Sequence, residues 1–390
     1  MPFIGNQPTA IPLASSDLED NIISTAKIQD NAVTAAKYVE PIPFRNIIIN
    51  GDMSIAQRAT STASITSTGY HTVDRWKHQF LGGCGTWTIS QDTDIPSGQG
   101  FAKSLKLDCT TAKGTPDSNT RFLFSHLIEG QNLQYLKKGT SSAESLTASF
   151  WVKSNKTGTY ILAIYDADND RQIAKSYTID SASTWEKKII TFEGDTTGTL
   201  GNDNNASFQF NFWLAAGSNY SSGTLQTSWG SRVDANRAVG QVNLADSTSN
   251  EWYITGVQLE AGTSASDFEF LPVDVNLQRC QRYYYLHASG NNQNINMSAY
   301  YTSSYLVGNI DFPVEMRSAP SLVHSTGSNY YRLFRNGTTD DFNNFSEGLA
   351  RPTKNSASLE TALNISGTAG EAGISTTLNA SAFIAMQSEL

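Results

Sequence analysis

Runs of alternating apolar and polar residues recur through this chain, and they constrain its fold more than any other feature. The longest places large apolar side chains at alternate positions, namely Phe208, Phe210, Phe212 and Leu214. Similar runs occur at 105–109, 146–152, 160–164 and 186–192. A period of two is that of a β-strand with one buried face. With roughly ten such segments separated by turn residues, the sequence predicts an all-β fold built on a two-sheet sandwich, with 208–214 at its centre.

One later strand carries a break in its alternation. Trp252 and Ile254 share one side of the chain, whereas Val257 and Leu259 share the other if the period of two continues. Gly256 lies between the two pairs. A β-bulge at that glycine inserts one extra residue and brings all four apolar side chains onto one face. We therefore expect a bulged strand here.

A short helix is expected after this strand. Leu271-Pro272 ends an extended run, and from Asp274 the apolar period changes. Leu277, Cys280 and Tyr284 then fall at i, i+3 and i+7, and Asp274 is the candidate N-cap. This pattern predicts a helix that joins the sandwich to the rest of the chain.

Composition excludes several classes of partner. The chain has 390 residues, which favours two or three domains, and its net charge is −9. No cluster of lysine and arginine is present, so no nucleic-acid partner is expected. No apolar run of about 18 residues occurs, so no membrane insertion is expected. Cys84, Cys109 and Cys280 form an odd set, which excludes a full disulfide framework and favours free thiols made in a reducing compartment.

The N-terminal region has no core of its own. Three prolines fall within the first twelve residues, and a repeat with a period of ten follows in 20–38. Repeats this short cannot bury their apolar side chains within one chain, so other copies are the expected partner. The candidate oligomerisation residues are Ile22, Ile23, Ile28, Val33 and Tyr38. The alternative is an amphipathic helix or a solvated linker.

Three sequence features together resemble bacteriophage tail-fibre proteins. The decapeptides 20–28 and 30–38 resemble fibre shafts. The opening segment 46–58 with 72–76, and the closing segment 256–260 with 280–284, resemble the two ends of a jelly-roll domain of phage fibres that is similar to carbohydrate-binding modules. The resemblance implies a virion-docking segment at 1–19, with Phe3 and Ile4 as candidate contacts. It further implies a shaft at 20–43 and a jelly-roll at 44–285.

A second, smaller β-sandwich is predicted at 286–390. Tyr301, Ser303, Tyr305 and Val307 alternate as in one strand, and Asn336-Gly337 predicts a hairpin turn. The segment 312–320 resembles one that follows the jelly-roll in the same phage proteins, and the last ten residues predict a final strand. Its core is small, so we expect neighbouring copies to complete it.

No catalytic motif is visible, so the chain is not expected to be an enzyme. His71, His78, His126, His287 and His324 lie outside nucleophile and metal motifs. Asp166, Asp168 and Asp170 alternate as in a calcium loop, but the glycine and glutamate of that pattern are missing, so a solvated hairpin turn is the preferred interpretation. No cofactor is expected.

Sugar binding requires aromatic faces together with polar side chains. The candidate glycan or receptor contacts are Tyr220, Trp229, Tyr300, Tyr301, Tyr330 and Tyr331. The alternative is that these rings pack against neighbouring chains, because interfaces are also rich in tyrosine and tryptophan.

The resemblance implies a virion fibre protein, assembled in the host cytoplasm as a homotrimer. It would be held by a tail or other virion component through its N-terminus, and would bind a host-surface glycan or protein through its C-terminal part. Two alternatives stay open. One is a head fibre, collar or adaptor that binds no host molecule, and the other is a depolymerase that cleaves host polysaccharide.

Overall fold

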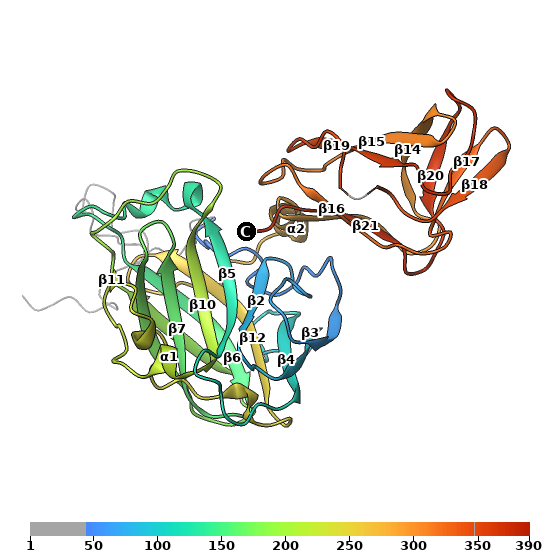
Figure 1. Cartoon of the computed structure of the whole chain (residues 1–390). Helices are drawn as coiled ribbons and strands as arrows, with labels where there is room; N and C mark the ends of the chain where they lie inside the picture. The colour runs from blue at the N-terminus through green and yellow to red at the C-terminus, as the bar shows by residue number, and fades with distance from the viewer. Residues whose placement is uncertain (1–43, 347) are drawn as a thin grey trace, which may run out of the picture. The chain divides into compact units, whose positions relative to one another are not determined.

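The structure, a computed structural model, describes residues 44–346 and 348–390 (Figure 1). The predicted docking residues, the decapeptides and their oligomerisation residues lie outside this part. The first sheet of the described chain is antiparallel, with the spatial order β1 (Ser61–Ile65), β3 (Thr86–Asp92), β4 (Ser104–Thr111), β12 (Glu251–Ala261), β6 (Leu146–Ser154), β9 (Glu186–Phe192). The second has the order β11 (Gly230–Ser231), β8 (Arg171–Ile179), β7 (Gly158–Asp166), β10 (Ala206–Ala216), β5 (Arg121–Glu129), β2 (Trp76–Leu81). The predicted sandwich is therefore confirmed.

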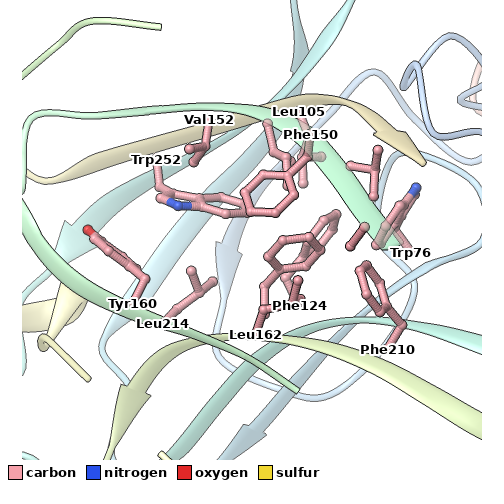
Figure 2. Close-up of a cluster of buried hydrophobic side chains, with 14 of the residues drawn as sticks. Trp76, Leu105, Phe124, Phe150, Val152, Tyr160, Leu162, Phe210, Leu214 and Trp252 are labelled. Carbon is pink, nitrogen blue, oxygen red and sulfur yellow. The ribbon is translucent and has the colours of Figure 1, made fainter. Parts of the chain in front are cut away.

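Aromatic side chains from both sheets fill the space between them (Figure 2). Phe150 of β6 meets Phe212 of β10 edge to face, with ring centroids 5.0 Å apart. Trp252 of β12 meets Phe124 of β5 in the same manner at 5.7 Å. Strand β10 pairs with β5 on one side and β7 on the other, so the 208–214 series is central, as its size predicted.

Strand β12 carries the predicted bulge. Its register with β6 shifts between Thr255 and Gln258, and Gly256 has φ of +62°. Beyond the bulge the phase of the strand changes, and four side chains are each fully buried, namely Trp252, Ile254, Val257 and Leu259. The extra residue thus keeps one apolar face on both sides of the bulge.

The helix prediction is partly wrong. Helix α2 spans Val273–Gln281, its N-cap is Pro272, and Asp274 lies in the first turn instead. Tyr284 is not helical, because it begins β13 (Tyr284–Ser289). Cys280 is buried, and Leu277 packs on the small cluster that Ile49, Ile55 and Tyr283 form with it. All three cysteines are free and buried.

The long segment 216–250 covers the outer face of the second sheet. It contains α1 (Ser218–Ser221) and the 3₁₀ turns η6 (Asp234–Asn236) and η7 (Leu244–Asp246). Tyr220 of α1 packs on Trp213 of β10, at a centroid distance of 5.6 Å. Both faces of β10 are therefore buried, which explains why Trp213 occupies a position that the alternation assigned to solvent.

The C-terminal strands form two further antiparallel sheets. The smaller one has the order β13, β21 (Phe383–Gln387), β16 (Ser321–His324). The larger one, called here the C-terminal sheet, has the order β18 (Thr338–Phe342), β17 (Tyr331–Arg335), β20 (Ala372–Thr377), β14 (Asn294–Thr302), β15 (Tyr305–Asp311), β19 (Ser356–Thr361). They enclose a buried cluster that includes Tyr331, Phe342 and Met386. The final strand and the Asn336-Gly337 hairpin turn are both confirmed.

One predicted strand is instead a hairpin. Tyr301 belongs to β14, Ser303 lies in the turn, and Tyr305 and Val307 belong to β15. The two strands pair with each other, with Ala299 opposite Val307. Two residues separate the strands, and the register shifts between Tyr300 and Thr302. Because of this shift, the hairpin preserves the alternation that the sequence shows.

The last residues of the described chain return to the start of the sandwich. The Glu389 carboxylate contacts the guanidinium of Arg75, which is fully buried, and lies 3.0 Å from Arg58 Nη2. Arg75 stacks on Tyr283, with its Cζ 3.4 Å from the ring centroid. Tyr70 and Lys77 each donate to the Leu390 carbonyl at 3.0 Å. No helix among the described residues is both long and apolar enough to cross a membrane.

Candidate functional site

The structure separates the six candidate contact residues by their exposure. Tyr220, Tyr300 and Tyr331 are buried, so their rings cannot stack on a ligand and these three predictions are corrected. Their burial follows from packing against the sheets that carry or flank them. Trp229 is half-buried and stacks on Phe208 at a centroid distance of 5.9 Å. Tyr330 packs partly against the C-terminal core.

Tyr301 alone of the six is freely exposed, with 76% of its surface open to solvent. It stands on the outer face of β14, while its neighbour Tyr300 points inward and is 2% exposed. The Tyr300 hydroxyl donates to the Asp340 carboxylate, and its ring faces the guanidinium of Arg335. The inward ring is therefore a structural group, and the outward ring is free to bind.

Tyr301 borders a hollow on the outer face of the C-terminal sheet, called here the Tyr301 hollow. Strand register places three small side chains side by side at its floor, because Ala299 lies opposite both Ala372 and Val307. Met297 and Asn309 border it further along the same strands. Taller side chains around a floor of small ones leave a depression of about 550 Å³.

The hollow combines the two kinds of contact that a sugar ring needs. Its floor and the Tyr301 ring offer apolar surface to the C–H face of a sugar. The exposed Asn309 accepts a hydrogen bond from Ser358 Oγ at 3.0 Å through its Oδ1, and its amide N–H groups remain available as donors. The Tyr305 hydroxyl lies nearby on β15 and donates to the Glu360 carboxylate, a hydrogen bond that raises the pKa of Tyr305.

An exposed apolar row crosses the same face of the sheet. Phe334 lies opposite Ile374, which lies opposite Met297 in the next strand. These side chains are 41%, 45% and 64% exposed respectively. A row of this kind suits contact with another macromolecule, because monomeric proteins rarely leave large apolar side chains contiguous and exposed.

A second aromatic cluster, missed in the sequence, lies on the outer face of the first sheet. Tyr253 and Trp185 meet edge to face at 6.2 Å, and Lys153 Nζ lies 4.2 Å from the Tyr253 centroid and 5.5 Å from that of Trp185. Lys106 donates to Glu251 at 2.6 Å, and Tyr253 donates to the same carboxylate at 2.8 Å. The lysines already occupy the ring faces, so this cluster offers less open aromatic surface than Tyr301. The only sequence feature that indicated this cluster was the alternation of Glu251 and Tyr253 with the buried residues of the strand.

The candidate calcium loop is a hairpin turn between β7 and β8. Asp166 is fully buried and lies 2.6 Å from Lys138 Nζ, while its Oδ1 accepts the Asp168 N–H at 3.0 Å. No group of three or more histidine, cysteine or acidic side chains suited to a metal ion occurs within 44–346 or 348–390.

The histidines serve packing or hydrogen bonding within the described fold. Burial lowers the pKa of both His78 and His126 well below the usual value, so both rings are neutral at pH 7. The half-buried His71 lies beside His78, with ring centroids 5.8 Å apart. Among the described residues, no hydrogen bond joins one of these rings to a serine, threonine or cysteine side chain that could act as a nucleophile.

Comparison with known proteins gives matches in fold only. No family model matches the sequence, and no curated protein matches it. The structure is similar to the enzymatically active domain of bacteriophage CBA120 tailspike protein 4, at 14% identity over 56% of this chain and 22% of that one, with a TM-score of 0.31. This chain thus spans about a fifth of that domain.

Two carbohydrate-binding modules are also similar over part of the chain. One is a family 61 module in complex with β-1,4-galactotriose, at 10% identity over 56% of this chain and 99% of that one, with a TM-score of 0.29. The other is the xylan-binding domain from Paenibacillus barcinonensis, at 11% identity, 53% and 94% coverage and a TM-score of 0.24. Matches with such scores describe a likeness and carry no argument about function.

Proposed function

We propose that this chain is a structural fibre protein of a phage virion and that it attaches to a host-surface glycan through the Tyr301 hollow. The observation that carries the binding role is the exposed ring of Tyr301 beside a floor of small apolar side chains and the amide of Asn309. The virion role rests on the decapeptides and the two jelly-roll signatures in the sequence.

The fibre is proposed to be a homotrimer in which several identical hollows act together. Each hollow is shallow, so a single site would bind a sugar weakly. Linking several sites on one rigid particle raises the overall affinity by orders of magnitude without any new contact. Multivalent adhesion therefore fits a small site on the surface of a β-sheet.

The direct test measures binding of the full chain to a panel of host-surface glycans. Tyr301→Ala should weaken binding to the best glycan at least tenfold, and Asn309→Ala should weaken it several-fold, because each variant removes one kind of contact. Tyr330→Ala is the matched control, because that tyrosine lies in the same part of the chain but does not line the hollow. Unchanged binding by Tyr301→Ala would contradict the proposal, and shortening of the glycan on incubation would favour a depolymerase instead.

The exposed apolar row favours a second role for this face, contact between copies of the chain. Phe334 and Ile374 lie outside the hollow, so Phe334→Ala should leave glycan binding intact. Sedimentation of this variant distinguishes the two roles. A loss of oligomer with Phe334→Ala or Tyr301→Ala would assign the face to an interface, whereas an unchanged oligomer with loss of glycan binding by Tyr301→Ala supports the adhesion site.

A further inference from the structure

A second hollow, called here the α2 cleft, lies where helix α2 meets the end of β5. Its volume is about 720 Å³. Arg279 of α2 and Arg282, the C-cap of that helix, line one part of it. Asn132 and Tyr135 line another part, from the 3₁₀ turns η4 (Gly130–Asn132) and η5 (Gln134–Leu136). Asp203 also lines the cleft. None of these side chains belongs to the Tyr301 hollow.

The cations of the cleft differ in whether their charge is compensated. Arg282 forms a two-pronged ion pair with Glu129, with Nε and Nη2 each 2.9 Å from a carboxylate oxygen. Lys354 lies 3.3 Å from Glu315. Arg279 has no carboxylate partner among the described residues, and its Nη2 makes a single long contact of 3.4 Å with the Asn46 carbonyl.

The uncompensated guanidinium is also partly removed from water. Burial lowers the pKa of Arg279 from its usual value, although the charges of Cys280, Glu269 and Tyr283 act in the opposite direction. A partly buried charge without a partner is unfavourable unless an opposite charge joins it. A bound carboxylate would make the same two-pronged contact that Glu129 makes with Arg282.

The His126 ring also lines the cleft, with its Nδ1 buried inside the wall. His126 accepts the Ile49 N–H through Nε2 at 3.2 Å, so the proton of the neutral ring resides on Nδ1. That Nδ1 has no hydrogen-bond partner among the described residues. This Nδ1 is closed to solvent, so His126 is part of the packed wall and a ligand in the cleft contacts other side chains.

The remaining groups suit the hydroxyls and the ring of a saccharide. Tyr135 is half exposed and presents an aromatic ring. Asp203 accepts two hydrogen bonds from Asn205, at 2.9 and 2.8 Å, and a carboxylate has room for further donors. Asn132 is exposed and can both donate and accept.

We infer that the α2 cleft binds an acidic saccharide, with the sugar carboxylate held by Arg279 and the hydroxyls by Asp203 and Asn132. Tyr135 supplies the apolar contact to the ring. The site is separate from the Tyr301 hollow. A fibre of this kind therefore recognises two features of a glycan, a neutral ring at the Tyr301 hollow and a carboxylate at the α2 cleft.

Isothermal titration of the full chain with glucuronate, glucuronate methyl ester, glucose and inorganic phosphate tests the inference. Glucuronate should bind the wild type, and the methyl ester and glucose should bind at least tenfold more weakly because they lack the charge. Phosphate should also bind at least tenfold more weakly because it lacks the ring and hydroxyl pattern. Arg279→Gln and Tyr135→Ala should each weaken glucuronate binding at least fivefold.

Two control variants make the result specific. Lys113→Gln removes the same charge near the other end of β5 and should leave glucuronate binding unchanged, since Lys113 pairs with Asp117 at a solvent-exposed site. Tyr301→Ala should also leave it unchanged, which separates this site from the proposed adhesion site. Absence of glucuronate binding to the wild type, equal binding of phosphate, or unchanged binding by a folded Arg279→Gln variant would each overturn the inference.

Discussion

Gly256 shows how one residue aligns a whole strand. Its positive φ forms the bulge in β12, and a Cβ built on it would lie 2.5 Å from Cζ of Phe101. The position therefore requires glycine for two reasons, backbone conformation and space. The sequence predicted this bulge because Gly256 stands between two apolar pairs of opposite phase.

Replacing Gly256 tests both requirements. Gly256→Ala should lower the free energy of unfolding by about 1–3 kcal/mol, because the methyl group strains the backbone and displaces Phe101. Urea denaturation measures the change. Gly98→Ala is the matched control, because Gly98 has a φ of +75° but a methyl group there would meet no atom within 4 Å. An equal loss in both variants would contradict a role for the Phe101 contact.

Residue-scale predictions reached their limit at Tyr300 and Tyr301. The two rings are adjacent in sequence and identical in chemistry, so composition gives both the same rank as ligand contacts. Only the register of β14 against β15 and β20 decides which ring is inside. That register depends on pairing between segments far apart in the chain, which local periodicity does not contain.

At the scale of elements, period-two alternation identified most of the strands but not what covers them. Alternation assigned the outer side of β10 to solvent, yet Trp213 is fully buried there beneath α1. Arg237 adds a cation–π contact, with its Cζ 5.3 Å from the Trp213 ring centroid. The segment 216–250 therefore acts as a cover for the sheet. Its polar composition concealed this, because only a few of its residues make the buried contacts.

The cover makes a prediction about Tyr220. Tyr220→Ala should lower the free energy of unfolding by about 3 kcal/mol, since it removes a buried ring and leaves a cavity over Trp213. Thermal and urea unfolding would report the loss. Tyr220→Phe keeps the ring and should cost less than half as much. Glycan binding by the folded Tyr220→Ala variant should stay unchanged, and a large loss of binding at full stability would restore Tyr220 as a contact residue.

The β14–β15 hairpin shows a second limit at this scale. The register shift between Tyr300 and Thr302 gives paired residues such as Ala299 and Val307 the same parity, so the outward side chains have odd numbers on both strands. A continuous strand and a tight hairpin then leave the same alternation in the sequence. Ser303 and Ser304 carried too weak a turn signal to tell the two apart.

At the scale of the whole described chain, Glu389 joins segments that are more than 300 positions apart. Its carboxylate compensates the charge of Arg75, which has no exposed surface, and it also contacts Arg58. Removing one member of a buried ion pair leaves the other charge uncompensated, which is costly. The contact therefore couples the C-terminal strands to the start of the sandwich.

Glu389→Gln should lower the free energy of unfolding by about 3–5 kcal/mol, because the Arg75 charge then stays buried without a counter-charge. Chemical denaturation monitored by tryptophan fluorescence measures the effect. Glu144→Gln serves as the control, since Glu144 pairs with Lys137 at an exposed site and should contribute less than about 1 kcal/mol. Similar losses in the two variants would contradict the coupling.

Asp74 in the same cluster predicts a pH dependence. Burial raises its pKa to about 6, although Arg58 and the hydrogen bonds from Gln57 act in the opposite direction. The folded chain thus takes up this proton at a higher pH than the unfolded chain. Asp74 therefore adds stability as pH falls from about 6 towards 4, and this contribution is lost as pH rises through 6.

Comparison of the wild type with Asp74→Asn isolates this group from other titrations. On lowering the pH from 7 to 4.5, the free energy of unfolding should shift in favour of the folded wild type by up to about 2 kcal/mol relative to the variant. Urea unfolding at both pH values provides the measurement. A parallel response of the two proteins would show that Asp74 does not titrate in this window.

The Glu389 contact also sets an order of events during synthesis. A ribosome makes Arg58 and Arg75 hundreds of residues before it makes Glu389, so both guanidinium groups wait in the growing chain without their counter-charge. The nascent sandwich can pair its strands, but the buried site of Arg75 lacks its carboxylate partner until Glu389 has been made. A product truncated just before Glu389 would therefore contain every described strand but leave the Arg75 charge without its partner, a local defect that chaperones and proteases can recognise.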